Sequence, residues 1–207
     1  MIIIVLKFIL HLYLNISLQE GTGPDDGWIP SIGNGVVVIE DRTIGTGENA
    51  TNTSYFVHRG REAPIDGPRQ NIDPLCFIQG SKYQISLDLR LENSNGTEYI
   101  CDKAAESGPD VCPLVSFAMA SKDGIIDFLN VKNRAGAQWE SGFNEYSGIF
   151  TVTEKMATSF ASYFFIRGPR QDVDIVFDNV LIEPYFPVLV TCDEVREIST
   201  SCYAAIV

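Results

Sequence analysis

The stretch YQISLDLRLE, residues 83–92, decides the fold class of this chain. Apolar and polar side chains alternate at every step from Tyr83 to Glu92. Successive side chains of a β-strand point to opposite faces, so a period of two buries one face of the strand and leaves the other in water. The stretch therefore predicts a β-strand with one face on a core.

Further strands are predicted on both sides of this stretch, and Gly, Pro, Asn and Asp fill nearly every gap between them. No window has the pattern of a long amphipathic helix. The predicted strands cover residues 36–40, 54–58, 114–120, 125–131, 149–153, 160–166 and 173–182. Eight or nine strands separated by turns predict an all-β fold, either a sandwich or a jelly roll.

Three segments are expected along the chain. Residues 1–14 form an apolar leader that is too short to span a bilayer comfortably; it resembles a signal peptide without the usual basic start, and a short membrane anchor is the alternative. Residues 15–185 form the β domain, which is expected to end near Tyr185 because prolines flank that point. Residues 186–207 form a cysteine-containing extension or the start of a further domain.

The charge of the chain limits its partners. The formal net charge is −12, from 27 acidic and 15 basic residues. Such a chain repels the phosphates of nucleic acid and the anionic headgroups of lipids, so nucleic acid is not expected as a partner. Contact with a membrane is expected only through an N-terminal anchor. A neutral glycan or a calcium ion is compatible with this charge.

Cysteines and glycosylation sequons favour a secreted or extracellular protein. Two short-range disulfides are predicted, Cys101 with Cys112 and Cys192 with Cys202, and Cys76 is left over for a partner outside the chain. The alternative is that all five cysteines are reduced in a cytosolic protein. Glycosylation is predicted at Asn49, Asn52 and Asn95, which lie in sequons within polar, loop-like stretches.

Three segments, in order, resemble a known family. They are residues 15–21 followed by Trp28, residues 61–70 leading into Leu75 and residues 80–83, and residues 165–169 leading into residues 173–180. Together they are similar to carbohydrate-binding modules of the family 4, 9, 16 and 22 type, over residues 15–185. The resemblance implies a galactose-binding-like jelly roll, a β-sandwich of two antiparallel sheets. It also implies binding of a β-glucan or xylan-like polysaccharide and linkage to a glycoside hydrolase.

Candidate ligand-binding residues follow from this resemblance and from side-chain chemistry. Arg and Gln bind vicinal hydroxyls, and aromatic rings stack on the C–H face of a sugar. The candidates are Arg61, Gln70, Trp139, Tyr146 and Tyr163. The alternatives are a structural role for Arg61 and packing in the core for the three aromatic residues. Ile65 stands where similar modules have a stacking aromatic, which favours the alternative of an adhesion or structural ectodomain that has lost sugar binding.

A structural calcium ion is also implied by the resemblance, near the first and last strands. Glu20, Glu48 and Asp178 are the candidate ligands, because calcium prefers carboxylate and carbonyl oxygens. A hydrogen-bonded Asp178 without a metal is the alternative. No Glu-x-Asp-x-Glu pattern and no Gly-x-Ser-x-Gly motif is present, so the module is expected to be non-catalytic and any hydrolysis to belong to a linked domain.

Overall fold

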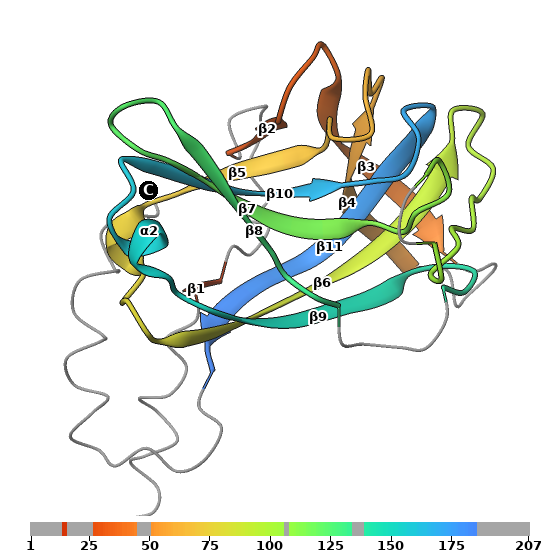
Figure 1. Cartoon of the computed structure of the whole chain (residues 1–207). Coiled ribbons are helices and arrows are strands. Elements are labelled where there is room, and N and C mark those ends of the chain that lie inside the picture. Colours follow the sequence, from red (N-terminus) through yellow and green to blue (C-terminus); the bar gives the residue numbers. More distant parts are fainter. Residues whose placement is uncertain (1–13, 16–26, 45–50, 106–107, 134–138, 186–207) are drawn as a thin grey trace, which may run out of the picture.

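The computed structural model describes residues 14–15, 27–44, 51–105, 108–133 and 139–185, which form a β-sandwich (Figure 1). One sheet has the strand order β3-β4-β11-β6-β9, with the short strand β1 also paired to β11, and the other has the order β2-β5-β10-β7-β8. Neighbouring strands are antiparallel throughout both sheets. The prediction of a jelly-roll β-sandwich with two antiparallel sheets is therefore confirmed.

The first sheet consists of β1 (Leu14–Asn15), β3 (Val36–Ile44), β4 (Thr51–Arg59), β6 (Lys82–Asn93), β9 (Asn144–Thr151) and β11 (Val173–Pro184). The second sheet consists of β2 (Trp28–Pro30), β5 (Pro68–Ile72), β7 (Leu114–Ala120), β8 (Ile126–Asn130) and β10 (Ala161–Arg167). The described residues also include two short helical turns, the 3-10 turn η2 (Pro74–Cys76) and α2 (Glu154–Ala157).

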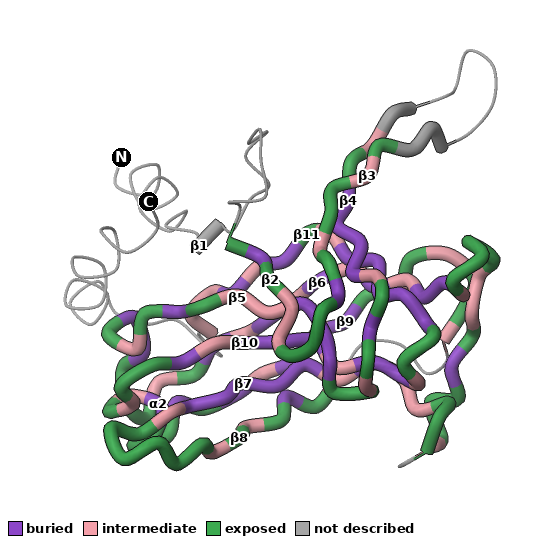
Figure 2. The backbone as a smooth tube through the Cα atoms, turned by 90° about the horizontal axis from the view of Figure 1, so that it is seen from above, coloured by how far each residue is buried: buried purple, intermediate pink, exposed green. Residues whose placement is uncertain are grey.

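The core lies between the two sheets. In β6 the odd-numbered side chains Ile85, Leu87 and Leu89 are buried, as the alternation predicts. Trp28 joins the sheets, because its ring lies 4.5 Å from that of Phe177 in the first sheet and 5.1 Å from that of Phe164 in the second. Each such aromatic pair stabilises the fold by about 0.5–1.5 kcal/mol beyond the contribution of the apolar area that it buries. Figure 2 shows the buried positions along the packed strands, and the β3–β4 hairpin extending away from the sandwich.

The strand predictions agree with the structure except at the short strands β1, β2 and β5. The range 114–120 matches β7, and the other predicted strands overlap observed ones with shifted ends. Neither β2 nor β5 was predicted, because each is short and contains proline, which normally argues against a strand interior. Both prolines lie at strand ends, where a missing N–H is tolerated.

The disulfide between Cys101 and Cys112 is confirmed; the two Cα atoms are 5.0 Å apart. It closes the loop between β6 and β7, and a link of this kind stabilises a fold by about 2–4 kcal/mol, mainly by restricting the unfolded chain. Cys76 is buried, which does not favour a disulfide to another chain. Cys192 and Cys202 lie outside the described residues.

The predicted terminal segments also fall outside the described residues, except for Leu14 in β1. At the other end, β11 stops at Pro184, close to the expected end of the domain. Within the described ranges, no helix has the length and apolar character needed to cross a membrane.

Candidate functional site

An aromatic layer covers the outer face of the second sheet. The side chains of β10 alternate, so that Phe164 and Ile166 enter the core while Tyr163 and Phe165 face outward. Register places Tyr163 opposite Ala118 of β7, and Ala118 opposite Phe128 of β8. Side chains opposite each other in antiparallel strands share one face of the sheet, so these residues lie together although they are distant in sequence.

The rings of this layer are in contact. The ring centroids of Phe128 and Phe165 are 6.2 Å apart, and those of Phe165 and Tyr163 are 5.8 Å apart. The Arg69 guanidinium of β5 continues the row, with its central carbon 4.8 Å from the centroid of the Tyr163 ring. We call these four residues, Phe128, Phe165, Tyr163 and Arg69, the aromatic face.

Small side chains on β7 make this layer possible. Ser116 and Ala118 occupy the outward positions between β8 and β10, and both are buried. Because neither side chain rises far above the strand, rings from the two neighbouring strands meet over it. Phe128 remains 61% exposed. Phe165 itself is only 6% exposed and Tyr163 is half-buried, so Phe128 provides most of the aromatic area that solvent reaches.

Arg61 is structural, and its assignment to a ligand site is corrected. Its side chain is buried and donates to the backbone carbonyl oxygens of five residues, Pro64, Asp66, Pro169, Arg170 and Val173. Burial lowers the pKa of Arg61 to about 10, while Asp66 and other carboxylates oppose the shift, so the guanidinium stays charged at neutral pH. All its donors are used inside the domain.

Tyr146 is also structural. It is buried on the core side of β9, and its hydroxyl donates to the carbonyl oxygen of Val131 and accepts from the amide of Val115 at 3.2 Å. Burial raises its pKa to about 12. Its assignment as a sugar contact is therefore wrong, for the same reason as for Arg61.

Gln70 and Trp139 do not join the aromatic face. Gln70 is opposite Trp28 and Phe164 in register, so it shares their side of the sheet. Trp139 is half-buried and packs against the main core. Of the five predicted ligand residues, Tyr163 alone lies on the aromatic face.

His58 and Asp66 form a buried polar pair beside Arg61. Both side chains are fully buried, with His58 Nε2 3.6 Å from Asp66 Oδ1. Burial, followed by the charge of Arg61, lowers the pKa of His58 to about 4, so the imidazole is neutral at pH 7. Burial raises the pKa of the Asp66 carboxyl. The contact is therefore not an ion pair at neutral pH.

The neutral state of His58 predicts a loss of stability in acid. The unfolded chain binds a proton at His58 below pH 6.5, whereas the folded chain resists it down to about pH 4. Stability is thus full above pH 6.5 and falls by about 3 kcal/mol as the pH drops to 4. Urea unfolding at pH 7 and pH 4.5 measures this, with His58→Gln as the reference. We expect the wild type to lose about 2.5 kcal/mol more than the variant, and equal losses would contradict the assignment.

The calcium prediction remains a prediction. Glu20 and Glu48 lie outside the described residues. Asp178 is on the outer face of the first sheet, opposite Asp88, and its Oδ1 accepts from the amide of Asn179 at 2.8 Å. Burial, and next the charge of Asp88, raise the pKa of Asp178. Among the described residues, no three His, Cys, Asp or Glu side chains converge as a metal site would require. Asp178 and Asp88 by themselves are too few ligands for calcium.

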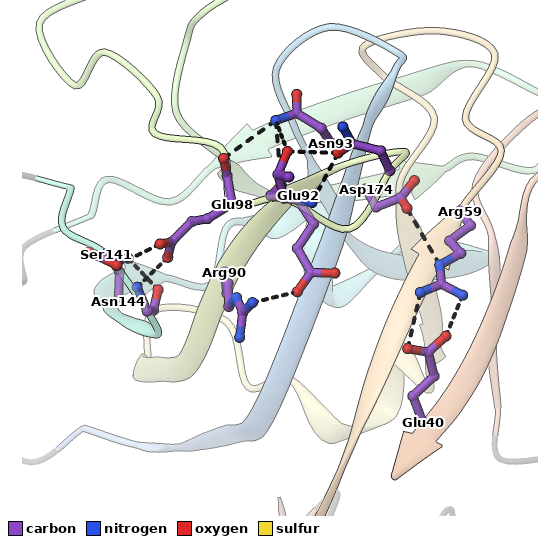
Figure 3. Close-up of polar contacts among 12 residues, drawn as sticks. Glu40, Arg59, Arg90, Glu92, Asn93, Glu98, Ser141, Asn144 and Asp174 are labelled. Atoms are coloured by element: carbon purple, nitrogen blue, oxygen red, sulfur yellow. Dashed lines mark hydrogen bonds and ion pairs between the residues drawn. The ribbon is translucent and has the colours of Figure 1, made fainter. Parts of the chain in front are cut away.

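The outer face of the first sheet differs from the aromatic face because its charges pair with one another. Arg59 contacts both Glu40 and Asp174, its Nε lying 3.4 Å from Asp174 Oδ2 (Figure 3). Arg90 Nη2 lies 2.8 Å from Glu92 Oε1. These arginine and carboxylate groups form ion pairs with one another, so their arrangement does not require a charged ligand.

A depression of about 650 Å³ lies at the loop end of the sandwich, where the disulfide-closed loop meets the β10–β11 turn. Its lining comprises Pro64, Gly108, Pro109, Arg170, Gln171 and Asp172. Arg170 Nε already pairs with Asp172 at 2.9 Å, and its guanidinium lies 5.3 Å from the Tyr99 ring. Because its charged groups are paired internally, we favour the aromatic face as the site.

One predicted glycosylation site has a suitable geometry. Asn95 is exposed in the turn after β6, and Thr97 of the same sequon donates from its hydroxyl to the Asn95 side-chain oxygen at 2.6 Å. The side chain of Asn52 in β4 and the whole of Asn49 lie outside the described residues.

Sequence reasoning missed Phe128, Phe165 and Arg69. Residues 163–166 are apolar on both faces, so no alternation separates the core rings from the outer ones. One signal was present in β8, where Ile126 and Phe128 alternate with Asp127 and Leu129. Nothing local shows that Phe128 and Phe165 meet, because β7 separates them.

No protein-family model and no curated protein matches the chain. Among solved structures, it is similar to a family 22 xylan-binding domain, with a TM-score of 0.54, 11% identity, and coverage of 87% of this chain and 97% of that one. It is also similar to the C-terminal family 22 module of Clostridium thermocellum Xyn10B, with a TM-score of 0.52, 12% identity, and coverage of 79% and 89%.

A third similar structure holds the N-terminal family 22 module of Xyn10B from Clostridium thermocellum together with its family 10 xylanase module, in complex with xylohexaose. The TM-score is 0.50 at 14% identity, covering 80% of this chain and 27% of that one. At these identities the similarity establishes the fold. The described chain therefore has the galactose-binding-like jelly-roll fold of the family 22 carbohydrate-binding modules.

Proposed function

We propose that this chain is a non-catalytic module that binds a xylan-like or β-glucan polysaccharide on the aromatic face. The observation that carries the proposal is the row of contacting rings Phe128, Phe165 and Tyr163 on the outer face of the sheet, of which Phe128 is 61% exposed, Tyr163 half-buried and Phe165 6% exposed. The C–H groups of a pyranose ring pack well on aromatic rings, and a row of rings suits consecutive sugars of a chain. The shared fold with xylan-binding modules supports the same ligand class.

The composition of this face supports binding without chemistry. Hydrolysis of a glycosidic bond uses two carboxyl groups on opposite sides of the bond. The described strands of the second sheet hold a single carboxylate, Asp127, which pairs with Lys155 at 2.9 Å. A linked glycoside hydrolase would supply any catalysis, and the module would raise the concentration of that enzyme on its substrate.

The proposed location is outside the cell. The Cys101–Cys112 disulfide supports an oxidising compartment, and the exposed Asn95 sequon supports passage through a secretory route.

Affinity electrophoresis in gels containing xylan, mixed-linkage β-glucan or cellulose tests the proposal. We expect xylan or β-glucan to retard the wild type, and Phe128→Ala to weaken that binding about ten-fold through loss of one stacking ring, or about 1.4 kcal/mol. Because Phe128 is 61% exposed, its removal should leave the fold intact.

Phe160→Ala is the matched control. Phe160 is 70% exposed but precedes β10, outside the row of rings. It should bind as the wild type does. An unchanged Phe128→Ala, or an equal loss in both variants, would remove the aromatic face from the site. No retardation by any glycan would favour the alternative, a secreted adhesion or structural ectodomain, which the exposed Ile65 in place of an aromatic residue suggests.

A further inference from the structure

The outward positions of the second sheet carry an unusual charge for this protein. The chain holds 27 acidic and 15 basic residues. Nevertheless Arg69 and Arg167 occupy outward register positions on this sheet, in line with Phe165 and Leu114. The one carboxylate in these strands, Asp127, is opposite the core residue Met119 and therefore faces the other way. The described part of this face is thus basic in a strongly acidic protein.

Within the described ranges, no carboxylate contacts Arg69, in contrast to three other arginines. Arg59, Arg90 and Arg170 each contact a carboxylate, and Arg61 contacts five carbonyl groups. Arg69 is half-buried against Tyr163, and its Nε is buried with no hydrogen-bond partner among the described residues. The same holds for the Nε atoms of Arg90 and Arg170, but a carboxylate contacts each of these two guanidinium groups. A guanidinium partly removed from water and without a partner costs free energy, which an anionic ligand would offset.

We propose that the polysaccharide bound on the aromatic face carries carboxylate groups, as in a uronic-acid-substituted xylan, and that Arg69 binds them. This inference rests on the proposed function. The guanidinium presents a planar fork that matches the two oxygens of a carboxylate, and it lies beside the rings that would stack the sugars. One side chain of the sheet thus selects the acidic substituent while its neighbours hold the backbone of the glycan.

The outer face of the first sheet, on the other side of the sandwich, is unsuited to an acidic glycan. There Asp88 stands between Glu145 and Asp178 in register, on the outer side of the first sheet. Burial, and next the charge of Asp88, raise the pKa of Asp178 on that face, so further negative charge is unfavourable there. An acidic glycan is repelled by the first sheet and attracted by the second.

Binding of glucuronoxylan, compared with the same polymer after its carboxyl groups are reduced to alcohols, tests the inference. We expect the wild type to bind the acidic polymer about ten-fold more tightly. Raising NaCl from 50 to 500 mM should remove most of that difference and leave binding of the reduced polymer nearly unchanged, since salt screens the ion pair and not the stacking.

Arg69→Gln should bind both polymers equally, within two-fold of the wild type on the reduced one. Arg170→Gln, at an arginine away from the aromatic face, should keep the preference. Equal wild-type affinity for both polymers would overturn the inference and leave the proposed function standing. Absence of binding to either polymer would overturn both. The salt and reduction series on the wild type decide the matter even if Arg69→Gln fails to fold.

Discussion

Replacing Arg61 by alanine is expected to destabilise the domain by about 4 kcal/mol, a large part of the 5–15 kcal/mol typical of a whole domain. The guanidinium donates to carbonyl groups of two separate loops, residues 64–66 and residues 169–173. Removing it leaves these buried oxygens without donors and opens a cavity between the loops. Urea unfolding at pH 7 measures the loss. Arg61→Lys should recover little, because one ammonium group cannot reach carbonyls on both loops.

Arg170→Ala is the control for this change. Its side chain is 43% exposed and pairs with the exposed Asp172, so its loss should cost at most about 1 kcal/mol. A comparable loss in the two arginine variants would contradict the structural role of Arg61. The effect on stability is also separate from glycan binding, since Arg61 has no donor left for a ligand.

Replacing Gly67 by alanine is expected to cost more than about 4 kcal/mol, enough to unfold a marginal domain. A Cβ at this position would lie 1.7 Å from the carbonyl oxygen of Ile166 and 2.7 Å from its carbonyl carbon. Both atoms belong to the backbone of β10, so no side-chain rotation relieves the overlap. β5 would have to separate from β10, which also separates Arg69 from Tyr163. Far-UV circular dichroism and urea unfolding measure the result.

Gly124→Ala is the matched control. Gly124 lies in the β7–β8 turn with nothing within 4 Å of a new Cβ, and its φ of +78° makes alanine cost about 1–2 kcal/mol from backbone strain alone. Gly67→Ala should be clearly worse. If the two variants were equally stable, the close approach of β5 and β10 would be wrong.

The role of Arg61, which lies between two copies of the tetrapeptide Gly-Pro-Arg-Gln, could not be predicted from local sequence. The tetrapeptide occurs at residues 67–70 and 168–171. The two copies have different flanks, and in sequence they look like unrelated turns. In the fold they lie on either side of Arg61, which bonds to the carbonyl of Asp66 just before the first copy and to Pro169 and Arg170 of the second. The chemistry of Arg61 suggested sugar binding, but its surroundings give it a structural role.

The fold class and most strands could be predicted from local sequence, because the direction of a side chain along a strand follows from its own position and its nearest neighbours. The Cys101–Cys112 disulfide could also be predicted, since few residues separate the two cysteines. The candidate site, in contrast, depends on contacts between strands that are far apart in the sequence. Phe128, Phe165, Tyr163 and Arg69 come from β8, β10 and β5, and they meet because two strand registers, set by contacts between distant parts of the chain, place them on one face. The different burial of two tyrosines also comes from the tertiary structure, since Tyr163 faces outward whereas Tyr146 is enclosed in the core.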